Sequence, residues 1–336
     1  LREAEVYVEG EHLRGQRKAK QLRAPKVIAQ RIVAHVTTPA PRILLMATYD
    51  DSGILTLDTV ENITITDARY SPKFLTALIN STLVSWFVYL FVFNKAVRTM
   101  DFDNYYIAKI PLPKLELSKD AHKAQHDRLG DLAGQMLDLN RARQKAERAF
   151  TETLKGYERE YLSLREGYYD RSEYRGSHIQ CQPLIDANEK GEVTGIRVDE
   201  DPDTQSLRIA GRVDDEWRDI VRLGIADEDF RLFLFFGLRA FLEEKRRKKI
   251  WARGKILRGV LEALQVPVLV VAGAGLNIKR IKQLMGEFKR KCPSEALHLS
   301  QLEATLHDTD AQIDDLVYDL YGITPEEREI IEASLR

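Results

Sequence analysis

The chain has 336 residues, of which 44% are hydrophobic and 31% are charged. Its 51 lysine and arginine residues nearly balance its 52 aspartate and glutamate residues, so the formal net charge is 51 − 52 = −1. These values exclude a uniformly basic nucleic-acid-binding protein and an acidic disordered tail, so any basic surface must be local.

Length and cysteine content indicate the number of domains and the redox state of the compartment. The length is typical of about two domains. The two cysteines, Cys181 and Cys292, are isolated from each other, so they form neither a disulfide framework nor a CxxC metal site. We therefore expect a reducing, cytoplasmic setting. The chain begins at Leu1 with a polar segment that lacks the order of a signal peptide, so we expect a fragment of a longer protein.

Short β-type runs fill the first part of the chain. Residues 5–8 alternate weakly, and runs rich in β-forming residues follow at residues 27–36, 42–49, 54–57 and 62–66. The sequence Asp50-Asp51-Ser52-Gly53 lies between two of these runs and favours a turn. We therefore predict a hairpin whose strands are residues 42–49 and 54–57.

An apolar helix is predicted next. Ser71 is a favoured N-cap and Pro72 fits the first helical position. Residues 83–93 (LVSWFVYLFVF) carry no charge, but a membrane span needs about 20 apolar residues, so we predict a helix buried in a domain core. A short strand over residues 105–110 and a stop at Pro111 then close a mixed α and β domain, residues 1–117.

A long helix with a narrow apolar seam follows. The seam begins at Leu129 and ends at Leu164, with spacings of three and four, which predicts a spacer helix over residues 118–167. A second seam, from Leu299 to Leu320, lies within residues 296–336. Because one narrow seam cannot bury itself, the two seams predict a long antiparallel helix pair. The alternative is that each helix packs on the domain next to it.

Residues 168–295 read as a second α+β domain, inserted between the two long helices. The sequence Asp201-Pro202-Asp203 predicts a hairpin between β-type runs, and residues 266–272 (VPVLVVA) predict a buried strand. A helix that begins near Phe230 leads into a basic cluster over residues 245–258. The predicted fold class is therefore α+β, with a mixed first domain, a long antiparallel helix pair and an inserted second domain.

Motifs for catalysis are weakly developed. Gly273-Ala274-Gly275 follows a strand, but Ile278 occupies the third glycine position of the dinucleotide fingerprint, so we interpret it as a tight turn. The seven histidines form no HExxH or Cys/His cluster. The acidic stretches at residues 199–203 and 214–216 could suggest a nuclease metal site, but Pro202-Asp203 is not followed by the rest of a PD-(D/E)xK pattern, so we interpret them as solvated loops. We predict no metal site and no catalytic residue in this chain.

Four segments stand out by their order and spacing: residues 25–32 (PKVIAQRI), 74–81 (FLTALINS), 110–113 (IPLP) and 313–324 (IDDLVYDLYGIT). After the last of these, Thr324, Pro325 and Glu327 fit a capping box at a helix start. Together the segments resemble the C-terminal specificity region of TaqI-like and Eco57I-like adenine-specific DNA methyltransferases and fused restriction–modification enzymes. The resemblance covers residues 1–165 and 296–336 and leaves out the middle insert.

The resemblance implies a target-recognition domain, with paired helices, that reads the sequence of double-stranded DNA. In that family the S-adenosylmethionine site and the NPPY-type catalytic motif lie upstream, and Asn104-Tyr105-Tyr106 is not NPPY. No cofactor is therefore expected in this chain, and S-adenosylmethionine is expected in a missing upstream domain. The parent protein would be an adenine-specific methyltransferase, and the resemblance leaves open whether it also cleaves DNA.

The leading hypothesis is a DNA recognition module of a restriction–modification or phage-defence methyltransferase. Arginine pairs well with guanine and lysine with phosphate. The candidate DNA contacts are Arg17, Lys18, Lys20, Arg23, Lys26, Lys95, Arg98 and Lys109. The expected partners are double-stranded DNA, an upstream methyltransferase domain and a second copy or assembly through the long helices, with no membrane. The alternatives are a helical protein–protein scaffold and a nuclease in the inserted domain.

Overall fold

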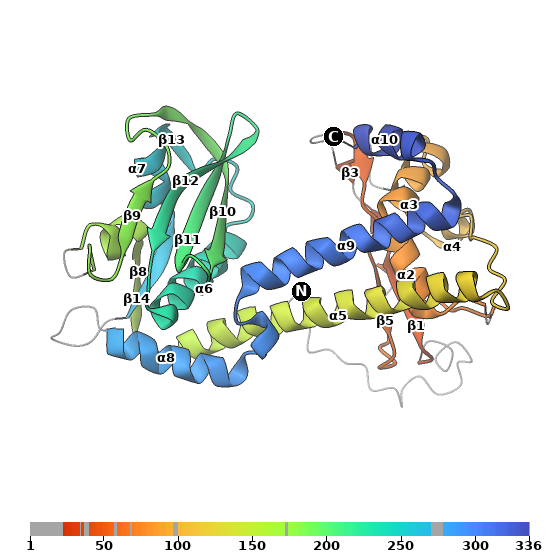
Figure 1. The fold of residues 1–336 in the computed structure, drawn as a ribbon, viewed down its shortest axis with the longest axis horizontal. Helices are drawn as coiled ribbons and strands as arrows, with labels where there is room; N and C mark the ends of the chain where they lie inside the picture. The colour runs from red at the N-terminus through yellow and green to blue at the C-terminus, as the bar shows by residue number, and fades with distance from the viewer. Residues whose placement is uncertain are drawn as a thin grey trace. The chain divides into compact units, whose positions relative to one another are not determined.

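The computed structural model describes residues 23–335 except residues 34, 37–39, 57–58, 68, 97–99, 172–173 and 270–277 (Figure 1). Its fold class is α+β, as predicted from the sequence. The described residues divide into two compact units. The first unit runs up to Asp138 and resumes at Leu306, and the second is Leu139–Thr305. The strand predicted at residues 5–8 and the Gly273-Ala274-Gly275 turn lie outside the described residues.

The first unit is built on a three-stranded antiparallel sheet. Strand β1 (Lys26–Gln30) lies between β5 (Ala47–Asp50) and β6 (Val60–Ile63). The predicted hairpin between residues 42–49 and 54–57 is therefore wrong, because β5 takes β1 as its partner and residues 54–56 form no strand. Two short ladders complete the β structure: β2 (Ile32–Val33) with β7 (Met100–Asp101), and β3 (His35–Val36) with β4 (Arg42–Ile43).

Helix α2 (Pro72–Asn80) begins where its capping residues predict. The Ser71 side chain accepts a hydrogen bond from the Phe74 N–H at 3.1 Å, and Pro72 is the first helical residue. Asn80 then holds the helix end to the sheet, since its amide pairs with both the N–H and the C=O of Ala47 at 2.8 and 2.9 Å. Ser81 caps the next helix, α3 (Thr82–Phe87).

The apolar run at residues 83–93 forms α3 and the π-helical turn η2 (Val88–Val92). Its residues Leu83, Val84, Val88 and Phe93 are buried, whereas Phe91 is exposed. Among the described residues, no single helix is long and apolar enough to cross a membrane; α2 and the 82–92 helix pass that test only together, across a 59° bend.

Two apolar faces of α2 enter two different cores. Leu75 and Ile79 pack with β1 and with residues of α3 and η2. Phe74 and Leu78 instead pack against two long helices, α5 (Asp120–Lys155) and α9 (Leu299–Tyr321), and against α10 (Pro325–Ala333). The partners on these helices are Leu129, Leu132, Ala133, Ile313, Val317, Tyr318 and Ile331.

The long helices run in opposite directions, as the two seams predicted. In the first unit Arg128 of α5 donates to Gln312 of α9 at 2.8 Å, and in the second unit Arg143 of α5 lies 4.0 Å from Glu303 of α9. Helix α5 ends at Lys155 and not near residue 167, because the chain then enters strand β8 (Arg159–Ser163).

Two further local predictions have opposite outcomes. Helix α9 ends at Gly322, whose φ is +66°, and Thr324 and Glu327 form the predicted capping box at the start of α10. The predicted strand at residues 105–110 is wrong: Asp103 accepts hydrogen bonds from two following N–H groups and starts a short helix, α4 (Asn104–Ile107).

The second unit contains a five-stranded antiparallel sheet in the order β13-β10-β11-β12-β9. Its strands are β9 (Gln180–Pro183), β10 (Lys190–Asp201), β11 (Ser206–Val213), β12 (Glu216–Gly224) and β13 (Ala252–Lys255). The hairpin predicted at Asp201-Pro202-Asp203 is confirmed, since β10 and β11 pair on either side of it. Asp214 and Asp215, both with positive φ, form the turn between β11 and β12.

Helices α6 (Glu228–Glu244), α7 (Ile256–Ala263) and α8 (Ile278–Lys291) and the two-stranded ladder of β8 with β14 (Gln265–Leu269) complete the second unit, with single turns η3 (Arg165–Tyr169) and η4 (Ser294–Ala296). Residues 230–238 of α6 are all buried, including Arg231, which pairs with buried Glu200 at 2.9 Å. A Cβ at Gly237 would lie 2.8 Å from Pro267, so this glycine permits the close approach of α6 to β14.

Candidate nucleic-acid interface

The cations of the first unit were the predicted DNA contacts, and the structure separates them into different environments. Lys26 is fully buried at the start of β1. Its Nζ lies 2.6 Å from the carboxylate of Asp50 and donates to the C=O of Ile54 at 2.8 Å. Lys26 therefore holds the chain after β5 against β1, and it lies inside the unit and not on a surface that DNA could reach.

The Asp50 carboxylate is the centre of this buried cluster. It also accepts hydrogen bonds from the Ser52 N–H and hydroxyl at 3.0 and 2.6 Å and from the Ile54 N–H at 3.1 Å. Burial opposes ionisation of this carboxyl, but the hydrogen bonds from Lys26 and Ser52 outweigh it and lower the pKa of Asp50. The cluster is therefore an ion pair with nearly complete hydrogen bonding.

Arg23 lies beside this turn, and its side chain is exposed. A Cβ at Gly53, whose φ is +74°, would lie 3.2 Å from the Arg23 backbone oxygen. The glycine thus allows the turn to pass close to the backbone of Arg23. Among the predicted contacts of the N-terminal group, Arg23 is the one whose side chain faces solvent in the described part of the chain; Arg17, Lys18 and Lys20 lie outside it.

A second group of predicted contacts gathers around α4. Lys109 lies over the ring of Tyr105, with its Nζ 4.0 Å from the ring centroid, and Tyr105 is 65% exposed. The neighbouring Tyr106 packs on Phe93 at 5.1 Å, edge to face. Phe93 is followed by Asn94 and the exposed Lys95, so Lys95 lies two residues along the chain from this contact. We refer to Lys95, Tyr105 and Lys109 as the α4 patch.

The charges of the α4 patch are available for a ligand. Among the described residues, no carboxylate lies within ion-pair distance of Lys95 or Lys109. In contrast, Arg31 and Arg69 of the same unit are neutralised, because each makes a two-point ion pair with a carboxylate. The nearest oxygen distances are 2.7 Å for Arg31 with Asp101 and 2.6 Å for Arg69 with Asp67.

The backbone at the α4 patch is also unusual. Asn94 and Lys95 both have positive φ, +49° and +57°, at the end of η2. A lysine seldom takes this left-handed conformation, and the Lys95 N–H is held by the C=O of Tyr89 at 2.9 Å. The fold therefore fixes the direction in which Lys95 leaves the helix. Arg98, the remaining predicted contact, lies outside the described residues.

Tyr105 is a residue that the sequence analysis passed over. The run of tyrosine and isoleucine was interpreted as a strand, which would have alternated the tyrosines between two faces. The Asp103 cap and the lysine four residues after Tyr105 were the signals for a helix with an aromatic–cation pair on one side. Exposed tyrosine beside lysine suits a sugar–phosphate backbone, where lysine holds phosphate and the ring contacts sugar or base.

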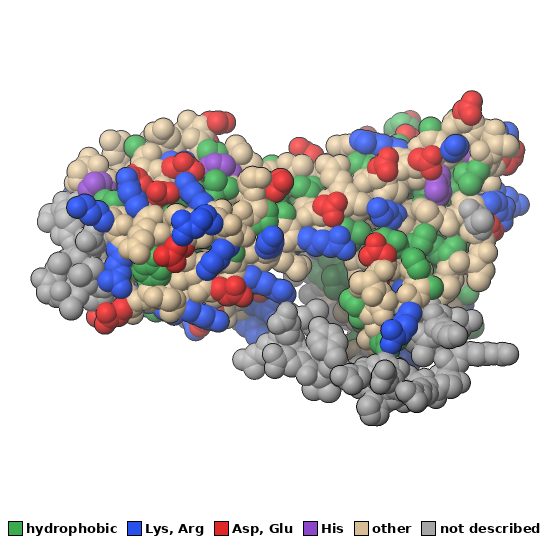
Figure 2. Space-filling model, turned by 90° about the horizontal axis from the view of Figure 1, so that it is seen from below, with side chains coloured by type: hydrophobic (Ala, Val, Ile, Leu, Met, Phe, Trp, Pro, Cys, Tyr) green, Lys and Arg blue, Asp and Glu red, His purple; other side chains and the backbone are tan. Residues whose placement is uncertain are grey.

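The second unit carries basic residues of two kinds. In the predicted cluster at residues 245–258, Arg246, Arg253 and Arg258 pair with glutamates. Helix α8 is more basic, with six lysine or arginine residues and one glutamate. Figure 2 shows Lys and Arg side chains spread over the face of this unit that is seen from below. Ion pairs therefore compensate much of the positive charge that the sequence places at residues 245–258.

The described residues do not support a metal site for the nuclease alternative. Asp214 and Asp215 form a tight turn, and Asp215 pairs with Arg212 at 3.0 Å. Within the described residues there is no group of three or more His, Cys, Asp or Glu side chains that could hold a metal ion. The described cysteines are free thiols, and burial raises the pKa of Cys181 and of Cys292 to about 11.

Comparison with known proteins adds one finding to this geometry. Residues 5–112 match the family model of the TaqI-like C-terminal specificity domain. No curated protein and no solved structure matches the chain. The match covers β1 to β7, α2 to α4 and the α4 patch, and it confirms the resemblance found in the sequence for this part of the chain. It supports a DNA specificity module of a restriction–modification enzyme.

Proposed function

We propose that this chain is the sequence-specific DNA recognition module of a restriction–modification or phage-defence enzyme that methylates N6 of adenine. The observation that carries the proposal is the match to a specificity domain over residues 5–112, in which an exposed patch of uncompensated lysines and tyrosine is built. Because the chain's own residues offer no methyl-transfer motif, the catalytic domain and its S-adenosylmethionine belong, on this proposal, to an upstream part of the parent protein.

The contacts divide into positioning and reading. Lys95 and Lys109 contact phosphates and set the position of the duplex, since lysine acts as a point charge on the backbone. Arg23 is a candidate for base contact, because it is exposed next to a tight turn at the end of the sheet. Lys26 has no contact in this proposal, since it is buried against Asp50.

The scaffold alternative relied on unpaired helical seams. In the described structure these seams are used inside the chain: Leu129 and Leu132 pack against Ile313 and Val317, and Phe150 packs on Phe236 at 5.4 Å. The long helices therefore serve first as part of each unit's own core. This internal packing gives the seams a role without assembly.

The test mixes the full chain with a pool of labelled DNA duplexes of random sequence. The duplexes that bind are separated and sequenced. Each phosphate contact that is lost should weaken binding to all sequences and reduce the slope of log affinity against log salt by about 0.9. We expect this for Lys95→Ala and Lys109→Ala. Lys123→Ala is the matched control, because Lys123 is an exposed lysine of the same unit on α5.

The outcomes separate the proposal from general basic attraction. Selection of one sequence motif, together with smaller salt slopes in the two α4-patch variants and an unchanged slope in the control, supports recognition. Absence of duplex binding at low salt by the folded chain refutes it. Equal effects of all three lysine variants would show that the α4 patch is not the interface.

A further inference from the structure

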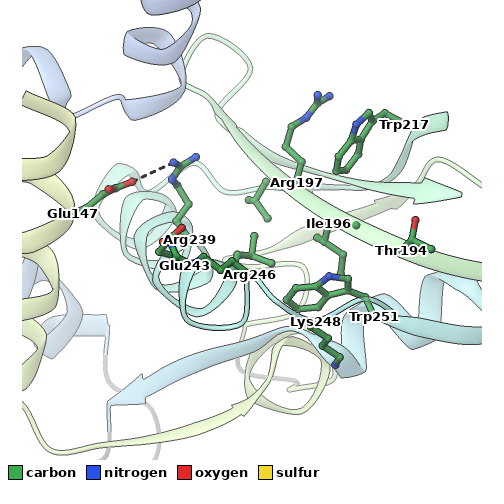
Figure 3. A pocket seen from close by; sticks show the side chains of 13 residues that line it. Glu147, Thr194, Ile196, Arg197, Trp217, Arg239, Glu243, Arg246, Lys248 and Trp251 are labelled. Atoms are coloured by element: carbon green, nitrogen blue, oxygen red, sulfur yellow. Dashed lines mark hydrogen bonds and ion pairs between the residues drawn. The ribbon is translucent and has the colours of Figure 1, made fainter. Parts of the chain in front are cut away.

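The second unit contains a pocket of about 450 Å³ that the proposed function does not use (Figure 3). It lies between the end of α6 and the edge of β10, and all its lining residues belong to the second unit. A volume of this size lies within the range of small-ligand sites. The pocket is lined by aromatic, cationic and backbone groups, each of which gives a separate indication of its ligand.

Two tryptophans provide flat surfaces. Trp217 of β12 is 47% exposed, and its ring lies over Gly195, where a Cβ would stand 3.2 Å from it. Trp251 is mostly buried and packs edge to face on Phe241. Figure 3 shows the two indoles on opposite sides of the strand that carries Ile196 and Arg197, so they flank its edge. An exposed tryptophan held flat by a glycine is a stacking platform.

Cations accompany both rings. The guanidinium of Arg197 lies 5.2 Å from the Trp217 ring centroid, and Nζ of Lys248 lies 5.0 Å from that of Trp251. Four cations and two glutamates line the pocket, but Arg197 pairs with Asp199, Arg239 with Glu303 and Arg246 with Glu243. Within the described residues no carboxylate lies within ion-pair distance of Lys248, so its charge is available for a ligand.

One donor in the lining is buried without an acceptor. Arg239 pairs with Glu303 at 2.7 Å and with Glu147 at 3.2 Å through its terminal nitrogens, but its Nε is buried and has no hydrogen-bond partner among the described residues. A buried donor left unpaired is unfavourable, so an acceptor in the pocket would be stabilised there.

The backbone supplies the last group of contacts. Strand β13 pairs with β10 only over Lys190–Val193, so residues 194–198, which line the pocket, have no partner strand on that side in the described structure. Their free N–H and C=O groups alternate along the edge and can bond a ligand that has both donors and acceptors.

We propose that this pocket binds a nucleic-acid base together with its attached phosphate. Trp217 stacks the base, the strand edge bonds its polar rim, and Lys248, across that edge, holds the phosphate. A peptide strand could use the free edge, but it would leave the exposed indole of Trp217 and the unpaired charge of Lys248 without a role. The combination of aromatic platform and cations is the one found where proteins bind single-stranded nucleic acid.

The ligand could be a free nucleotide or a nucleotide within a single strand, and two titrations distinguish these sources. Deoxyadenosine monophosphate is titrated into the full chain by calorimetry, and a labelled thymidine oligonucleotide of about 12 nucleotides is titrated by fluorescence anisotropy. Trp217→Ala should weaken binding on the order of ten-fold, whereas Trp217→Phe should retain most of it. Lys248→Ala should weaken binding and reduce its salt dependence.

Matched controls lie in the same unit. Tyr161→Ala removes another exposed aromatic residue, and Lys190→Ala removes another exposed lysine; neither residue lines the pocket, so neither variant should change binding. Because Trp217 is half exposed, its variants should keep the wild-type Tm, which is measured alongside.

Binding of the oligonucleotide alone identifies a single strand as the source, and binding of the monophosphate identifies a free nucleotide; either supports the proposal if Trp217→Ala weakens it. The proposal is overturned if neither ligand binds at millimolar concentration, if Trp217→Ala and Tyr161→Ala behave alike, or if the pocket binds an extended peptide instead. Lys95→Ala and Lys109→Ala should leave this binding unchanged, so its failure is distinguishable from failure of duplex recognition in the first unit.

Discussion

The buried pair of Lys26 and Asp50 gives the sharpest test of the first unit, because its two members should not be equivalent. Removing one partner from a buried ion pair destabilises a protein by about 3–5 kcal/mol. In Lys26→Met, Asp50 keeps its bonds from the Ser52 N–H, the Ser52 hydroxyl and the Ile54 N–H. We therefore expect a loss near the lower end, about 3 kcal/mol.

Asp50→Ala should be more damaging. It removes the carboxylate that compensates the fully buried ammonium of Lys26, and it also removes the acceptor of three other donors. Each hydrogen bond contributes about 0.5–1.5 kcal/mol, so the expected loss lies at the upper end, about 5 kcal/mol. The double variant should lose about 1–3 kcal/mol less than the sum of the two single losses. The reason is that it leaves neither an ammonium nor a carboxylate buried without the other.

The assay is urea unfolding with hydrogen exchange of the β1 and β5 amides, which reports the first unit by itself. Duplex binding is measured on the same samples. Lys26→Met should lower the unfolding free energy and leave duplex affinity unchanged under conditions where the chain stays folded, whereas Lys109→Ala should do the reverse. The reasoning is refuted if Lys26→Met weakens DNA binding without lowering stability, or if Asp50→Ala is the milder change.

Three further outcomes follow from single sites. Gly237→Ala should destabilise the second unit by roughly 1–3 kcal/mol through the clash with Pro267, while Gly286→Ala, which meets no atom within 4 Å, should be neutral or stabilising in thermal denaturation. Thr324→Ala should reduce stability by about 1 kcal/mol in urea unfolding, and an unchanged midpoint would exclude a role for the capping box. Burial raises the pKa of Asp314 above its ordinary 3.8, against the opposing hydrogen bonds from Thr82, so stability falls as pH rises from 3.8 through the raised value. Asp314→Asn should remove this fall, and parallel pH profiles of the variant and wild type would contradict it.

Local capping signals predicted element starts well, because their hydrogen bonds join residues three apart. Ser71 with Phe74 and Thr324 with Glu327 are such bonds, and both helices begin where the sequence indicated. The hairpin at Asp201 was predictable for a similar reason, since its turn and both strands are contiguous.

Pairing between distant strands was not predictable in this way. The turn at Asp50 looked like a hairpin because its bonds to Ser52 and Ile54 are local, but the partner of β5 is β1, and the link that fixes this is the ion pair of Asp50 with Lys26. Nothing near residue 50 distinguishes β1 from residues 54–57 as a strand partner. The same buried pair explains why Lys26 was selected as a DNA contact from its charge alone.

Periodicity alone overextended the long helix. Tyr157, Tyr161 and Leu164 continue the spacing of the seam, yet α5 ends at Lys155. Tyr157 and Leu164 are buried and Tyr161 is exposed, as expected of a turn and a strand and not of one helical face. The residues that decide this lie in β14, more than a hundred positions later, since β14 pairs with β8.

The residues that match the specificity domain contain only part of one hydrophobic core. Helix α2 lies inside the matched residues, but Phe74 and Leu78 are covered by α5, α9 and α10, which lie outside them. The link is polar as well: Asp314 of α9 accepts bonds from the N–H and hydroxyl of Thr82 at 2.8 and 2.6 Å, and so adds to the Ser81 cap of α3 from 232 positions away. A chain cut after residue 117 would expose this apolar face and remove the Asp314 bonds from the start of α3. Two of the segments singled out in the sequence, at residues 74–81 and 313–324, are therefore two sides of one core, although only the first lies within the matched residues.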